Sequence, residues 1–208
     1  MKKFEYTPPE QPRELILKLG QKITDRIGHT VTAEDPEYYG LEALVTDEMA
    51  EVALKMKVRK PMTLAQAVKA TGKEEKVLEE LLQEMSNIGL LEYNWENPKH
   101  EKQYVLPMYV PGSAEFFNMK LDQIKEHPEV ASFFERMAFL PLQKVTPMVP
   151  PGGAGIGMHV IPVEKAIETE NESVSVEHIS HWLDKYDGKY AAGPCSCRYS
   201  CLLYTSDA

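Results

Sequence analysis

The residues best suited to chemistry are cysteines, and all three lie at the end of the chain. Cys195, Cys197 and Cys201 fall within residues 193–208, GPCSCRYSCLLYTSDA. Thiolates are soft ligands that suit zinc or the iron of iron–sulfur clusters, and a closed tetrahedral site needs four ligands. The C-x-C pair Cys195 and Cys197 would supply two of them, from the end of a strand expected over residues 189–194. The alternatives are two unliganded thiols or a strained disulfide.

Cys201 does not belong with this pair. Residues 201–208, CLLYTSDA, result from translating TGT CTC TTA TAC ACA TCT GAC GCT in frame. That string looks like the end sequence of a transposase-based sequencing adapter. We therefore expect residues 201–208 to be an artefactual tail, which has no place in reasoning about fold or function, as with a fusion scar. On this interpretation the native chain was cut near Ser200.

Two other motifs carry weaker signals. The run GGAGIG at residues 152–157 does not fit G-x-G-x-x-G, because Met158 stands at the last position counted from Gly153. The prolines before it oppose a regular strand, so we expect a loop and no phosphate cradle. His178 and His181 are spaced i, i+3 and could share a helix face or complete a metal site. A solvated or core-edge pair is favoured, and we assign no catalytic residue.

The charge and hydropathy of the chain exclude several classes of protein. The 208 residues carry 23 lysines and arginines against 32 aspartates and glutamates, a net charge of −9. That balance opposes a general binder of nucleic acid or anionic membranes, because phosphate contacts need clustered cations. The chain has no run of about 18 apolar residues, so we expect no transmembrane helix. No apolar region follows the first lysines, so we expect no signal peptide. We expect a cytoplasmic protein.

The first part of the chain predicts two helices. Apolar spacing predicts a helix over residues 13–28 that ends at Gly28 and includes Ile27 in its apolar stripe. A second helix is predicted over residues 35–57, with Asp35 as its N-cap and Pro36 at the first helical position.

The best-patterned stretch begins at residue 62. MTLAQAVKATG (62–72) predicts a short helix capped by Thr63 and ended by Gly72. KEEKVLEELLQEMSNIG (73–89) predicts a second helix. Its spacing of i, i+4, i+8 and i+11 predicts a buried stripe, made of Val77, Leu81, Met85 and Ile88.

Residues 90–107 alternate between apolar and polar side chains and predict a β-hairpin with the turn ENPKHEK. Helices followed by a hairpin, and the phrase LLQEMSNIGLLEY in particular, resemble winged-helix domains of the ArsR and MarR kind over about residues 36–107. In DNA-binding members the second helix of the helix–turn–helix enters the major groove. Here residues 73–88 carry two lysines against five glutamates, so we expect a scaffold for protein packing and no specific binding of duplex DNA.

After Pro107 the pattern predicts a small α/β domain. Residues 111–145 predict two helices broken at His127–Pro128. A loop and a short strand, MHVIPV, follow within residues 146–164. A helix over residues 175–188 should turn inward three of its side chains, Ile179, Trp182 and Leu183.

The segments VIPVE (160–164) and PCSCR (194–198) resemble the N-terminal part of large iron–sulfur proteins of anaerobic bacteria. In that family further cysteines and ferredoxin-type 4Fe-4S motifs follow, and some members continue into an FAD- and NAD(P)-binding pyridine nucleotide-disulfide oxidoreductase module. The resemblance covers about residues 36–200. It implies that Cys195 and Cys197 are cluster ligands, whereas FAD and NAD(P) would belong to the C-terminal module.

The sequence therefore predicts an α+β protein with a winged-helix-type domain followed by a small α/β domain. The expected parts are an extension and helix (1–34), the winged-helix-like domain (35–108), the α/β domain (109–200) and the artefactual tail (201–208). The expected function is electron transfer in an iron–sulfur, 4Fe-4S oxidoreductase, of which this chain is a non-catalytic, metal-binding fragment. Its partners would be the rest of the parent chain and redox proteins. The alternative is a winged-helix regulator whose C-x-C senses metal or redox state.

Overall fold

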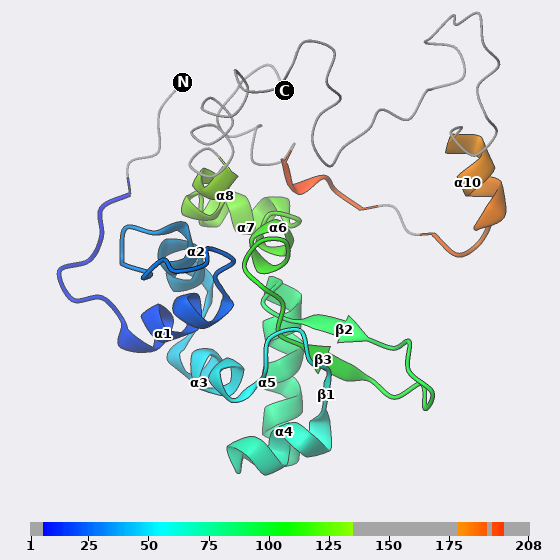
Figure 1. The fold of residues 1–208 in the computed structure, drawn as a ribbon, viewed down its shortest axis with the longest axis horizontal. Coiled ribbons are helices and arrows are strands. Elements are labelled where there is room, and N and C mark those ends of the chain that lie inside the picture. The colour runs from blue at the N-terminus through cyan, green and yellow to red at the C-terminus, as the bar shows by residue number, and fades with distance from the viewer. Residues whose placement is uncertain (1–5, 135–178, 191–192, 198–208) are drawn as a thin grey trace, which may run out of the picture. The chain divides into compact units, whose positions relative to one another are not determined.

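The computed structural model describes residues 6–134, 179–190 and 193–197. These residues fall into two compact units, which are described separately: residues 6–134 and 194–197 belong to one, and residues 179–190 and 193 to the other. The larger unit combines helices with a small antiparallel sheet (Figure 1). The α+β class predicted from the sequence is therefore confirmed, whereas the division into domains stays a prediction.

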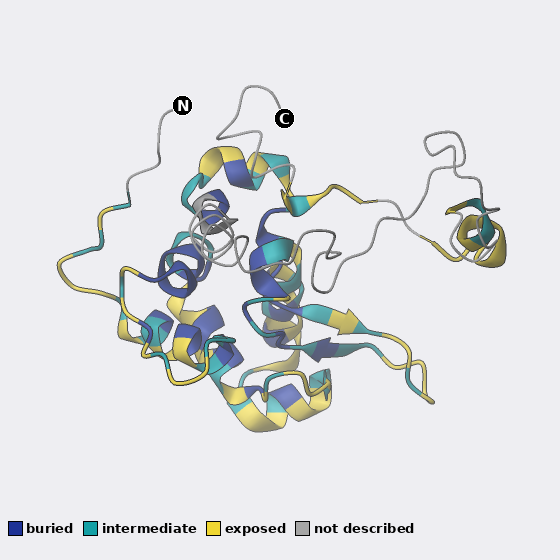
Figure 2. Ribbon diagram, turned by 45° about the horizontal axis from the view of Figure 1, so that its top comes forward, coloured by how far each residue is buried: buried dark blue, intermediate teal, exposed yellow. Residues whose placement is uncertain are grey.

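Three helices begin the larger unit: α1 (Glu14–Ile23), α2 (Pro36–Leu44) and α3 (Asp47–Lys55). Helix α1 packs against both α2 and α3. The buried stripes of these helices meet in one hydrophobic core, which continues along the chain as far as Val130. Figure 2 shows this arrangement, with buried residues on the inward sides of the helices and exposed residues outside.

The predicted pair of helices and the hairpin are confirmed. Helix α4 (Leu64–Thr71) begins at Thr63, which accepts a hydrogen bond from the Gln66 amide and donates its own amide to the Gln66 side chain. It ends at Gly72, whose φ of 72° is left-handed. Helix α5 (Glu75–Ile88) ends at Gly89, also left-handed. Glycine suits both ends because it has no Cβ to oppose positive φ.

Three short strands complete this part of the fold: β1 (Met62–Thr63), β2 (Glu92–Asn94) and β3 (Gln103–Val105). They form an antiparallel sheet in the order β1-β3-β2. Strands β2 and β3 are the two arms of the predicted hairpin, with Tyr93 opposite Tyr104. Tyr104 is buried in the core, so the sheet is fixed to the helices by its central strand.

The predicted break at His127–Pro128 is confirmed, with α7 (Leu121–Glu126) before it and α8 (Glu129–Phe134) after it. A further short helix, α6 (Ser113–Phe117), precedes them. Helix α8 packs on α2, so the chain returns to its first helices. The loop and strand predicted within residues 146–164 lie outside the described residues.

Two predictions for the first helices were wrong. Helix α1 ends at Ile23, not at Gly28, and Ile27 is fully exposed. The predicted helix over residues 35–57 is two helices, since Val45 is extended and the Thr46 side chain caps α3 by accepting from the Met49 amide. An apolar stripe cannot reveal such a break, because both helices bury their apolar side chains in one core.

The predicted register of α5 was also partly wrong. Val77 is 48% exposed, whereas Leu78, Leu82 and Met85 are fully buried. Leu81 and Ile88 pack at the edge of the core. The helix is therefore rotated relative to the predicted stripe, and its central line runs i, i+4, i+7 from Leu78.

In the smaller unit, helix α10 (Ile179–Lys185) confirms a helix within residues 175–188. Ile179, Trp182 and Leu183 are exposed and not turned inward as predicted. Residues 175–178, which include His178, lie outside the described residues.

Gly40 tests the packing of α2 against the later part of the chain. A Cβ at this position would overlap the hydroxyl oxygen of Tyr109 and lie 3.4 Å from its Cζ. Glycine to alanine inside a helix ordinarily stabilises by about 0.5–1 kcal/mol. Because the methyl group has no room here, we expect Gly40→Ala to destabilise by about 1–3 kcal/mol, measured by urea unfolding.

The control is the same substitution in a Tyr109→Phe background, where the obstructing oxygen is gone. Gly40→Ala should then cost much less than in the wild type. A stabilising effect of Gly40→Ala in the wild type would contradict the close approach of α2 and Tyr109.

Candidate functional site

The predicted metal ligands Cys195 and Cys197 are both exposed. The strand that was predicted to carry them is not found, since Lys189, Tyr190 and residues 193–194 are not in a strand, and Ser196 and Cys197 are helical. Pro194 explains part of this difference. Proline has no N–H to give to a sheet, and its fixed φ suits the approach to a helical turn.

The donor chemistry of this pair fits a soft metal, but it is incomplete. Two cysteine thiolates can supply half of a four-ligand set. Within residues 6–134, 179–190 and 193–197, no group of three or more His, Cys, Asp or Glu side chains could hold a metal ion. His181, the other histidine considered for this site, packs edge-on against Trp182 in α10. Within the described part of the chain, the two cysteines are therefore not part of a larger donor group.

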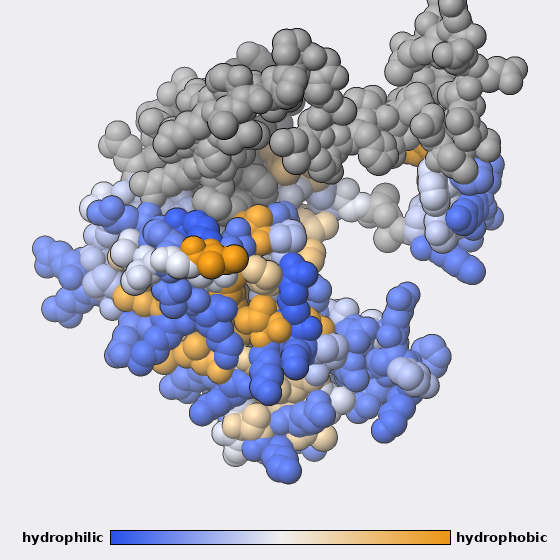
Figure 3. All heavy atoms as spheres, in the orientation of Figure 1, coloured by the Kyte–Doolittle hydropathy of each residue, from blue (hydrophilic) through white to orange (hydrophobic). Residues whose placement is uncertain are grey.

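The outward face of α5 is acidic. The exposed residues are Glu74, just before the helix, and Glu75, Lys76, Val77, Glu79, Glu80, Glu84 and Asn87 within it. Lys73, just before the helix, is paired with Glu48 of α3 at 2.6 Å. Phosphate groups approaching this face would meet several carboxylates and few available cations. In the space-filling view, the neighbouring hairpin end of the molecule is also mainly hydrophilic (Figure 3).

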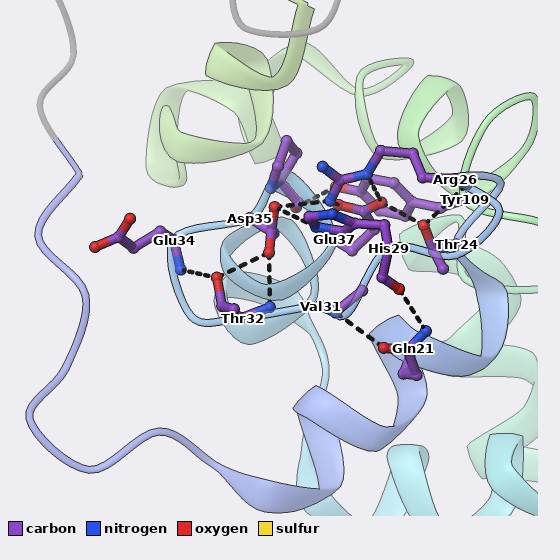
Figure 4. Close-up of polar contacts among 11 residues, drawn as sticks. Gln21, Thr24, Arg26, His29, Val31, Thr32, Glu34, Asp35, Glu37 and Tyr109 are labelled. Carbon is purple, nitrogen blue, oxygen red and sulfur yellow. Dashed lines mark hydrogen bonds and ion pairs between the residues drawn. The ribbon is translucent and has the colours of Figure 1, made fainter.

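A partly buried polar cluster of Thr24, Arg26, His29, Thr32, Asp35 and Glu37 joins α1 to α2, and the sequence analysis missed it. It lies in the loop between the two helices and at the start of α2 (Figure 4). Glu37 is its innermost member, with its side chain 1% exposed. Its carboxylate accepts hydrogen bonds from the Thr24 hydroxyl at 2.6 Å and from two nitrogens of Arg26 at 2.9 and 2.5 Å.

Asp35 is the second carboxylate of the cluster. It stands at the N-cap position of α2, as predicted, but its side chain does not cap the helix. It accepts instead from Arg26 at 2.8 Å, from His29 at 2.9 Å, and from the amide and hydroxyl of Thr32 at 2.6 and 2.8 Å. One guanidinium thus bridges two carboxylates, which share its charge.

The surroundings of the cluster shift two pKa values. Burial opposes ionisation of Asp35, but the hydrogen bonds from Arg26, Thr32 and His29 outweigh it and lower its pKa to about 2. Burial alone would lower the pKa of Arg26, but its hydrogen bonds to Glu37 and Asp35 raise it overall. The Asp35 carboxylate is therefore held ionised beside a guanidinium that stays charged.

The cluster fastens the loop in place. Gln21 of α1 donates to the carbonyl of His29 and accepts from the amide of Val31. Tyr109, far along the chain, donates its hydroxyl to the carbonyl of Pro36 at 2.7 Å. Because the carboxylates and the guanidinium engage one another, this arrangement positions α2 and leaves no charged group poised for a substrate. Isolated polar residues in a loop have no periodicity, so no sequence signal identified the cluster.

The low pKa of Asp35 predicts a pH dependence of stability. Its ordinary value is 3.8 and its value in the folded protein is about 2. A lowered carboxyl pKa stabilises the folded state above the unfolded value, and this stabilisation is lost as pH falls through the folded value. Between about pH 4 and about pH 2, the wild type should lose about 2 kcal/mol more than Asp35→Asn. Equal losses in urea titrations of the two proteins would contradict this.

None of the described residues belongs to a helix long and apolar enough to cross a membrane. Comparison of the chain with protein-family models, curated proteins and solved structures gives no match. The case for a function therefore rests on the residues themselves, above all on the exposed cysteine pair.

Proposed function

We propose that the chain is the N-terminal part of an iron–sulfur electron-transfer oxidoreductase. In this proposal Cys195 and Cys197 provide two ligands to a 4Fe-4S cluster, whose chemistry is the transfer of single electrons. The single observation that carries the proposal is the pair of exposed thiols separated by one residue. Thiolates are the usual ligands of such clusters, and exposure leaves room for ligands from another segment.

The proposal gives residues 6–131 a structural role. Helices α4 and α5 with the three-stranded sheet would form a winged-helix-type scaffold that packs against protein. The glutamates on the outward face of α5 support this use, because they would repel the phosphates of a duplex. FAD and NAD(P), if the parent protein uses them, would be held by its C-terminal module.

The alternative function is a winged-helix regulator in which the C-x-C pair senses metal or redox state. The order of two helices and a hairpin is the observation in its favour. A regulator of this kind would have to bind duplex DNA specifically. Sub-micromolar binding at physiological salt, measured by fluorescence anisotropy, would favour this alternative over the electron-transfer proposal.

Cobalt(II) can probe the cysteine pair in the 208-residue chain. Under anaerobic conditions, we expect cobalt to give a thiolate-to-metal charge-transfer absorption that is lost in Cys195→Ser and in Cys197→Ser. Cys201→Ser is the matched control, since this cysteine belongs to the expected artefactual tail and should not change the absorption. A spectrum that depends on Cys201 and not on the other two would overturn the ligand assignment.

The proposal for the parent protein is tested on the longer protein, in which further native residues would follow Ser200. Reconstitution of that protein with iron and sulfide should give a visible sulfur-to-iron absorption, and each of the two serine variants should lower its iron content. Full iron content in both variants would show that the cluster, if present, uses other ligands.

A further inference from the structure

Among the described residues, strand β2 is an edge of the sheet. In the order β1-β3-β2 it pairs only with β3, and within the described residues no other strand lies beside it (Figure 1). Its exposed side carries aromatic residues, since Tyr93 is 39% and Trp95 53% exposed. Proteins usually protect such edges with lysine, proline or a covering element, because an unpaired edge can pair with another chain.

Two hollows flank this strand. The larger, of about 670 Å³, extends from Arg59 and Val105 to Phe116. The smaller, of about 450 Å³, lies between the end of α5 and the start of α7, and its apolar lining includes Leu91, Phe116 and Met119. Both hollows are bordered by Glu92 and Tyr93. An added strand would therefore have space for side chains beside β2.

Charge selects the kind of partner that this surface fits. Two copies of a chain with a net charge of −9 repel each other over most of their surface. The acidic face of α5 would oppose self-association most strongly. The hollows beside β2 are different, because Arg59 and Lys120 there balance Glu92 and Glu115. Because the charges balance locally, this surface does not repel a second copy of itself, so it can meet that copy across a two-fold axis.

We propose that β2 is a dimerisation edge, which pairs antiparallel with β2 of a second copy about a two-fold axis at Tyr93. In that register, Trp95 of the second copy stands opposite Leu91. Directly opposed residues of antiparallel strands point to the same face of the sheet. The Trp95 ring therefore enters the smaller hollow, against Leu91, Phe116 and Met119, while Asn94 stands opposite Glu92.

The pairing of three residues alone would not hold two chains together. Stable interfaces bury roughly 1,200–2,000 Å² in total. The two copies of Trp95, each seated in a hollow of the other chain, supply the buried aromatic anchors that dominate such interfaces. The proposal is independent of the cysteine pair and of any metal.

Analytical ultracentrifugation of the 208-residue chain tests the proposal. The wild type should sediment as a reversible dimer, and Trp95→Ala should weaken the dimer at least about tenfold, as expected for loss of an aromatic anchor. Met119→Glu, on the other side of the same contact, should weaken it similarly. Trp182→Ala is the matched control, because this other tryptophan is exposed on α10 and should leave the dimer unchanged.

Circular dichroism of each variant separates loss of association from loss of folding. A wild type that stays monomeric up to about 1 mM would overturn the proposal. So would a dimer that is unaffected by either Trp95→Ala or Met119→Glu while both variants are folded. Binding of a different protein or of another segment of the chain along β2 would leave the wild type monomeric and count against the proposal.

Discussion

Replacing Glu37 with alanine should lower the free energy of unfolding by about 2–4 kcal/mol. The reason is that the change removes a negative charge and leaves the positive charge and the hydroxyl group that it had bound. Glu37 is fully buried and accepts from Arg26 and Thr24. Without its carboxylate, Arg26 keeps Asp35 as its one ionic partner among the described residues, and the Thr24 hydroxyl loses its acceptor.

Removing one member of an ion pair with a buried carboxylate costs more than the pair contributes, because Arg26 then keeps one acidic partner in place of two while most of its side chain stays buried. Glu37→Gln should cost less than Glu37→Ala, since the amide oxygen keeps the shape and can still accept a hydrogen bond. This order distinguishes the electrostatic role of Glu37 from a purely steric one.

Urea unfolding at neutral pH measures the effect, and Glu51→Ala provides the matched control. Glu51 is an exposed glutamate of α3, so its removal should change stability by no more than about 0.5 kcal/mol. A Glu37→Ala variant as stable as the Glu51→Ala variant would show that the cluster does not fasten α2.

The parts of the fold that the sequence could predict are those with local signals. The capping box at Thr63, the left-handed glycines Gly72 and Gly89, and the alternation before and after the hairpin turn each depend on neighbouring residues alone. The third strand, β1, could not be predicted. It has two residues, and it exists only because Met62 meets Tyr104 of a strand far along the chain.

The two candidate sites also differ in whether a local sequence signal reveals them. The cysteine pair was visible as a spacing of two reactive residues in one short segment. The cluster of Arg26, Asp35 and Glu37 was not visible, because its members are brought together by the end of α1 at Ile23. The predicted continuation of that helix to Gly28 would have placed Arg26 within a helix. Only the observed ending lets its side chain reach both carboxylates.

Leu82→Ala should lower the free energy of unfolding by about 2–5 kcal/mol, because it truncates a fully buried side chain and leaves a cavity in the core. The register of α5 makes this prediction specific. Apolar residues occur on a broad arc of the helix, so the sequence allowed two neighbouring stripes, one centred on Val77 and Leu81 and one on Leu78 and Leu82. Contacts with the other helices select the second.

Val77→Ala is the matched control for that register. Val77 is 48% exposed, and alanine is a better helix former than valine, so the substitution should change stability by no more than about 0.5 kcal/mol. Thermal and urea unfolding of the two variants decide between the stripes directly. If Val77→Ala were the more damaging change and Leu82→Ala were tolerated, α5 would face the core with the side predicted from spacing alone, and the face of glutamates assigned to solvent would have to turn with it.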